Sequence, residues 1–82
     1  MTGKIKIIGA NNKTHLEWME KEFENCSILH NGSSFHVVSV PERGEFPFDI
    51  YKSLIIADRI VFEGHANIEG SHGRLAIEFF PQ

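Results

Sequence analysis

The stretch Thr14–Cys26, THLEWMEKEFENC, decides which fold the sequence predicts. Thr14 is followed three residues later by Glu17, which is the pattern of a helix capping box. On a helical wheel the apolar residues of this stretch gather on one face, as a helix packed against a core requires. These residues are Leu16, Met19, Phe23 and Cys26. We therefore predict an amphipathic helix over residues 14–26.

Trp18 lies outside that apolar face of the predicted helix. Its neighbours on the wheel are His15, Glu22 and Asn25, and the far side carries glutamates. Tryptophan is enriched at interaction hot spots, where polar neighbours shield it from water. The acidic helix would steer such an anchor to a basic surface. We expect Trp18, His15, Glu22 and Asn25 to form a partner-binding site; the alternative is that the ring folds over the edge of the core.

Strand patterns flank this segment on both sides. Residues 4–9, KIKIIG, alternate lysine with isoleucine, which predicts a strand. Residues 27–30 and residues 34–40 predict two more strands. They are separated by Asn31-Gly32, the favoured pair for a type I′ hairpin turn.

The second half of the chain is more ambiguous. Residues 48–57, FDIYKSLIIA, spread their apolar side chains over about half a helical wheel, and Pro47 suits the first turn of a helix. We predict a helix here, although the β-branched residues and a plausible alternation also fit a strand. Residues 59–63 and 74–80 predict strands, and residues 64–73 predict a loop that contains a turn.

The predicted order of elements is β-α-β-β-α-β-β. Its first six elements match the ferredoxin-like arrangement, a two-layer α+β sandwich with both helices on one face of an antiparallel sheet. The seventh would add a C-terminal strand at one edge. At 82 residues, we expect one small domain that covers residues 1–82.

Composition narrows the classes of function. The formal net charge of −3 argues against a general nucleic-acid binder, which needs clustered lysine and arginine. No apolar run reaches the length of a membrane span, and the N-terminus lacks the apolar core of a secretory signal. Cys26 is the single cysteine, so no internal disulfide can form. A cytoplasmic location is the expectation.

One candidate ligand site follows the first predicted strand. The residues GANNKT, Gly9 to Thr14, place a glycine and a Lys-Thr pair before a predicted helix start, as a phosphate-binding loop does. The second glycine of that motif is missing. An anion held by Gly9, Lys13 and Thr14 remains physically reasonable; the alternative is an ordinary capped helix start.

Other reactive side chains predict no site. His65 and His72 lie seven residues apart with Glu63 and Glu69 nearby, but the spacing matches no standard zinc motif, and surface loop residues are the better interpretation. Cys26 falls on the predicted core face, where a thiol is usually inert. We predict no catalytic residue, no metal and no cofactor.

The sequence therefore favours a non-enzymatic protein-binding module, a stoichiometric regulator or inhibitor of another protein. Small acidic domains of this make-up are common in phage and mobile elements, which is an association of composition. Self-association into a homodimer is also expected, because both faces of the predicted sheet carry apolar residues. The alternatives are a small-ligand (anion) binding regulatory domain and a small metal-dependent enzyme.

Overall fold

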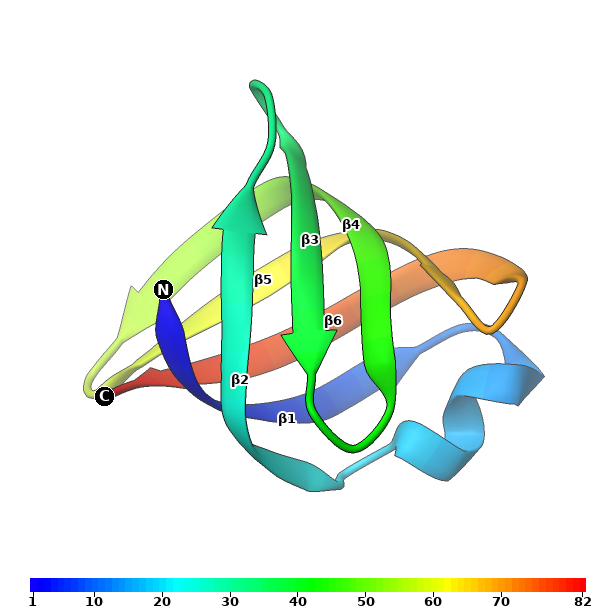
Figure 1. Ribbon diagram of the computed structural model, residues 1–82, viewed down its shortest axis with the longest axis horizontal. Helices are drawn as coiled ribbons and strands as arrows, with labels where there is room; N and C mark the ends of the chain where they lie inside the picture. Colours follow the sequence, from blue (N-terminus) through cyan, green and yellow to red (C-terminus); the bar gives the residue numbers. More distant parts are fainter.

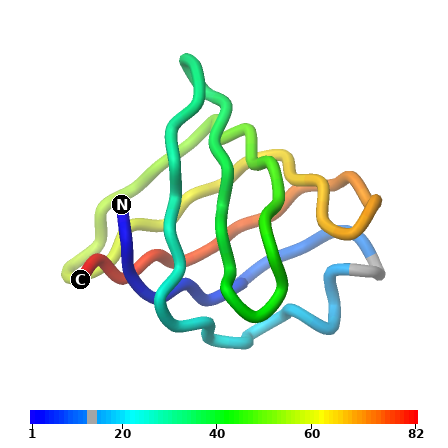
Figure 2. Tube along the Cα trace, viewed as in Figure 1, coloured from blue at the N-terminus to red at the C-terminus, as the bar shows by residue number. Residues whose placement is uncertain are grey.

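The computed structural model describes residues 1–12 and 15–82 and shows an all-β barrel. Six antiparallel strands follow one another in chain order, and the last pairs with the first to close the barrel (Figure 1). Figure 2 traces the same meander along the chain. The strands are β1 (Thr2–Ala10), β2 (Glu22–His30), β3 (Phe35–Val40), β4 (Gly44–Ile56), β5 (Arg59–Ile68) and β6 (Ser71–Pro81).

The predicted ferredoxin-like α+β sandwich is therefore wrong. The helical segment is a short 3₁₀ turn, η1 (Lys13–Trp18), between β1 and β2. No α-helix occurs among the residues that the structure describes. The strands predicted at residues 4–9 and 34–40 are confirmed within β1 and β3. The predicted hairpin at Asn31-Gly32 also forms, with the Asn31 amide donating to the Phe35 carbonyl at 2.7 Å. Its connection is the longer loop 31–34 and not a type I′ turn, since Gly32 has a positive φ, 95°, and Asn31 does not.

The predicted helix over residues 14–26 fails because a β-bulge imitates helical spacing. Phe23 and Cys26 both point into the core although three positions separate them. Cys26 pairs with Gly3 and Phe23 with Ile5, so β2 carries one residue more than β1 between these pairs. Such an extra residue breaks the alternation of a strand. Asn25, which has a φ of 57°, lies in this bulge.

A second bulge explains why residues 48–57 resemble a helix. Ile50 pairs with Gly64 and Lys52 with Glu63, so Tyr51 is an extra residue in β4. The whole segment lies in a strand or its following turn, and Pro47 lies opposite Val37 in the sheet instead of opening a helix. The alternative strand interpretation was the correct one.

The predicted loop over residues 64–73 is also mostly strand. β5 continues from the predicted strand 59–63 to Ile68, and β6 begins at Ser71. Glu69 and Gly70, with φ values of 53° and 84°, make the two-residue turn between them. Positive φ at both central positions matches the right-handed twist of the flanking strands.

Alternate residues of every strand fill the interior of the barrel. A small barrel leaves no channel, because its inward side chains meet across the axis. Five phenylalanines are buried there, and the ring centroids of Phe62 and Phe79 lie 6.4 Å apart. The buried apolar side chains are Ile5, Ile7, Trp18, Phe23, Cys26, Ile28, Val38, Val40, Phe46, Phe48, Phe62, Ala66, Ile68, Leu75, Ile77 and Phe79.

The η1 segment closes one end of this core. Trp18 packs beside two phenylalanine rings, with centroid distances of 5.5 Å to Phe23 and 5.8 Å to Phe46. Just after it, the Glu20 amide donates to the Ile7 carbonyl at 2.7 Å, which ties the connection to β1. The indole therefore covers the end of the barrel between β2 and β4.

Gly64 offers a test of the barrel packing. A Cβ atom on Gly64 would lie 2.5 Å from the Asp49 carbonyl oxygen and 2.6 Å from the Phe48 ring. Gly64→Ala should therefore lower the free energy of unfolding by about 2 kcal/mol, as overpacking does. Urea denaturation measures the change.

Gly9→Ala is the matched control, because a Cβ atom there makes an ordinary 3.6 Å contact with Ala76. Its stability should change by less than about 0.5 kcal/mol. Equal stability of the two variants would contradict the close approach of β4 to β5.

Candidate functional site

The structure places the predicted partner-binding residues in two different environments. Trp18 is 2% exposed and His15 is fully buried, so neither is a surface anchor. Glu22 and Asn25 are exposed on β2. The predicted exposed site at Trp18 is therefore wrong. Residues 14–26 do not form the helix from which that exposure was derived, and the indole ring packs in the core.

Polar groups hold η1 over the barrel end. The His15 ring lies with Nε2 3.3 Å from the Ser71 carbonyl oxygen, which links η1 to the start of β6. Arg43, in the turn between β3 and β4, lies over the Trp18 ring at 5.2 Å and donates to Glu17 at 3.4 Å. This end of the molecule is thus covered by contacts within the chain.

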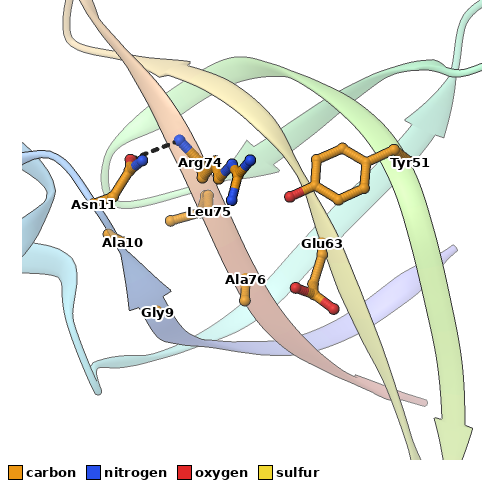
Figure 3. Close-up of a pocket in the computed structure, with 8 residues that line it drawn as sticks. All are labelled: Gly9, Ala10, Asn11, Tyr51, Glu63, Arg74, Leu75 and Ala76. Atoms are coloured by element: carbon orange, nitrogen blue, oxygen red, sulfur yellow. Dashed lines mark hydrogen bonds between the residues drawn. The ribbon is translucent and has the colours of Figure 1, made fainter.

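The predicted anion site coincides in part with a surface hollow of about 270 Å³. Gly9 lines it, together with Arg74, Tyr51 and Glu63, as Figure 3 shows. The Arg74 amide donates to Asn11 Oδ1 at 2.7 Å and fixes the end of β1 against β6. Lys13 and Thr14 lie outside the described residues.

The two histidines considered for a metal site do come together. The rings of His65 and His72 stack with centroids 6.4 Å apart, on the strand pair β5–β6. They line a second hollow of about 190 Å³ with Phe35 and Asp49. Within the described part of the chain, no group of three or more His, Cys, Asp or Glu side chains could hold a metal ion.

Cys26 is a buried free thiol. Its Sγ donates to the Phe23 carbonyl at 3.2 Å. Burial raises the pKa of the thiol above its ordinary value, because the interior disfavours the thiolate. The residue therefore lacks the exposed, ionised sulfur that a nucleophile needs.

The most unusual surface is the far half of β4. Pairing of β4 with β3 runs from Gly44 to Asp49, and the last contact is the Ile50 amide donating to the Ser34 carbonyl at 3.2 Å. Beyond that point β4 pairs with β5 alone over the described residues. We call residues 51–60 the β4–β5 arm, which extends to the left of Figure 1 in yellow-green. We call the side of residues 51–56 away from β5 the open edge.

The arm carries apolar side chains on both of its faces. Leu54 and Ile56 lie opposite Val61 and Arg59, on the outer face of the barrel. Ile55 lies opposite Ile60 on the face that lines the core elsewhere, but the arm passes beyond the last core layer. Four large apolar side chains are consequently exposed: Tyr51 by 60%, Leu54 by 52%, Ile55 by 75% and Ile56 by 47%.

Polar contacts hold the arm both near its tip and near its base. Arg59 donates to Glu78 of β6 at 2.7 Å, and its guanidinium lies 4.9 Å from the Phe80 ring centroid. Lys52 forms an ion pair with Glu63 across the hairpin at 3.5 Å. The arm is thus supported from β5 and β6, while its open edge has no neighbour among the described residues.

Sequence reasoning missed this surface because it assigned residues 48–57 to a helix that packs on the core. A usable signal was present in the adjacent β-branched residues Ile55 and Ile56, which favour a strand. Their exposure had no sequence signal, since it depends on where β3 stops pairing with β4.

Comparison of the chain with protein-family models, with curated proteins and with solved structures finds no match. The described part of the chain contains no helix that is long and apolar enough to cross a membrane. Function is therefore inferred from the geometry of the β4–β5 arm and the neighbouring hollows.

The state of Cys26 can be measured directly. A buried, protonated thiol should react with a disulfide reagent at least about 100-fold more slowly in the native protein than in denaturant. Because the native pKa is raised, the unfolded chain loses the proton first as pH rises. The contribution of Cys26 to stability is therefore complete below the ordinary thiol pKa and falls above it.

The stability of the wild type should accordingly decline more steeply above about pH 9 than that of Cys26→Ala. Denaturant titrations of both proteins between neutral and alkaline pH provide the comparison. Parallel declines, or a thiol that reacts equally fast in the native and unfolded states, would show that Cys26 is accessible.

Proposed function

We propose that this chain is a non-enzymatic protein-binding module whose docking surface is the open edge of β4. A partner would add an extended segment beside residues 51–56, so that backbone groups pair as in a sheet. The observation that carries the proposal is the run of exposed apolar residues along an unpaired strand edge. Native proteins normally protect such edges, so an unprotected one is typical of a binding site.

The chemistry of the edge suits this role. Backbone pairing would supply affinity, and the side chains that alternate between the two faces would supply specificity. Tyr51 at the base of the arm adds an aromatic ring, the kind of residue that dominates protein interfaces. A stoichiometric regulator or inhibitor of another protein remains the proposed role, and the single reduced cysteine supports a cytoplasmic setting.

Ile55→Lys tests the docking surface. The substitution places a charge at the most exposed apolar position of the edge, where it should lower affinity for a protein partner at least 10-fold. Partners would be captured from native lysate on the immobilised wild type and identified, and the purified pair titrated by calorimetry. A stoichiometric complex weakened by Ile55→Lys is expected.

Leu29→Lys is the matched control, because Leu29 is a 52% exposed apolar residue on β2, outside the arm. Circular dichroism should show that both variants keep the wild-type fold. If partners bind the wild type, Ile55→Lys and Leu29→Lys with equal affinity, the open edge is not the docking surface. If the wild type captures no protein at all, the proposed protein-binding function is wrong.

A second candidate function is the binding of a small anion in the hollow of Gly9 and Arg74. The guanidinium supplies a positive charge beside the glycine, although Glu63 in the same hollow opposes an anion. Inorganic phosphate should then raise the melting temperature of the wild type, because a ligand of the native state stabilises by mass action. Arg74→Gln should abolish the increase, and Lys4→Gln, which removes a positive charge outside the hollow, should retain it. An unchanged melting temperature would exclude this candidate.

A further inference from the structure

The open edge lacks the usual protection against pairing with another strand. Natural sheets protect their edges with proline, inward charges, bulges or short strands. Residues 51–56 hold no proline and one charge, Lys52, and the bulge at Tyr51 lies at the base of the arm rather than along it. Backbone amides and carbonyls of the far half of β4 are therefore available to a matching strand.

We propose that the open edge pairs antiparallel with the same edge of a second copy of this chain, about a two-fold axis at Ile55. The inference rests on the proposed function, since it names the occupant of the same edge. Two β4–β5 hairpins would then form one four-stranded sheet, β5–β4–β4–β5, across the dimer. An interface of this kind is isologous, because the same surface serves both copies.

This register places apolar side chains opposite apolar side chains on both faces of the arm. With Ile55 on the axis, it lies opposite Ile55 of the second copy, on the face that also carries Ile60. On the other face Leu54 lies opposite the second copy's Ile56, and the reverse pair forms by symmetry. Directly opposed side chains in an antiparallel pair have their Cβ atoms about 5 Å apart, close enough for apolar contact. Side chains on both faces of the edge therefore gain apolar neighbours.

Charge also favours a second copy. In the Ile55-centred register, Lys52 comes opposite the turn that carries Asp58 of the other chain. Within one chain Lys52 pairs with Glu63 and Asp58 with Arg59, so the second copy would extend this alternation of opposite charges, twice in a symmetric dimer. The net charge of −3 opposes association, but the arm itself carries Lys52, Asp58 and Arg59 and is not acidic. Repulsion between the copies is therefore low at this edge.

The exposed area fits a weak dimer. At their observed exposure, the four apolar side chains of the open edge present roughly 400 Å² in one copy. Edge pairing covers the flanks of these side chains and the backbone between them, so two copies bury less than the roughly 1,000 Å² of a specific, stable interface. We therefore expect a reversible dimer whose population rises with protein concentration.

A charge-swap experiment tests the axis. Ile55→Lys and Ile55→Glu should each be monomeric, because each would place two like charges opposite one another. An equimolar mixture of the two should recover a dimer, because lysine then faces glutamate. Sedimentation velocity at increasing concentration, up to about 1 mM, measures all four samples, including the wild type.

The same swap at Leu29 is the control, since that residue is equally apolar and 52% exposed but lies outside the arm. Leu29→Lys and Leu29→Glu should both dimerise as the wild type does. Circular dichroism of every variant establishes that the barrel is intact. A wild type that stays monomeric at about 1 mM, or an Ile55→Lys protein that dimerises normally, would overturn the proposal.

The register has its own measurement. Directly opposed residues of antiparallel strands have Cα atoms about 4.5–5.5 Å apart, within the range that a disulfide spans. In a Cys26→Ala background, Ile55→Cys should therefore form an interchain disulfide under mild oxidation at least about 10-fold faster than Leu29→Cys. A dimer that shows no such preference would exclude Ile55 as the axis.

These outcomes separate the inference from the proposed function. A monomeric wild type that loses a protein partner through Ile55→Lys would reject self-pairing and retain the docking edge. A dimer disrupted by Ile55→Lys, with no other partner captured, would establish the second copy as the occupant. If Ile55→Lys changes neither the dimer population nor the affinity for captured partners, both proposals are rejected.

Discussion

The pairing of β1 with β6 is the interaction on which the rest of the structure depends. It runs from Gly3 opposite Pro81 to Ala10 opposite Leu75, and the Gln82 amide adds a bond to the Thr2 carbonyl at 3.1 Å. Closing the ring gives each strand a neighbour on both sides, over different parts of its length where the strands are staggered, and creates one enclosed core. Gly3 permits the close approach, because any Cβ there would collide with the Phe80 carbonyl.

Closure also makes the two ends of the barrel different. Strands in a closed barrel are staggered, so some of them extend past their neighbours. At one end η1 covers the core with Trp18, and Arg43 holds it in place. At the other end the β4–β5 arm extends beyond β3 and keeps an unpaired edge. The proposed binding edge thus lies away from η1 (Figure 1).

The bulges connect the fold to both the failed predictions and the proposed site. Each inserts one residue, at Asn25 in β2, at Ile8 in β1 and at Tyr51 in β4. An extra residue changes a period of two into a local spacing of three, which a sequence pattern cannot distinguish from a helix. At Tyr51 the bulge also marks the place where β4 leaves β3 and the arm begins.

The sequence by itself determined the local elements that depend on neighbouring residues. Alternation placed strands at residues 4–9 and 34–40, and Asn31-Gly32 marked the turn between two strands, because glycine readily adopts the positive φ that Gly32 shows. Only the tertiary structure decided whether Phe23 and Cys26 belong to a helix or to a bulged strand, since the answer comes from pairing with β1. It likewise decided that Trp18 is core and that Ile55 is exposed. Burial depends on strands distant in sequence, and no local pattern records where their pairing ends.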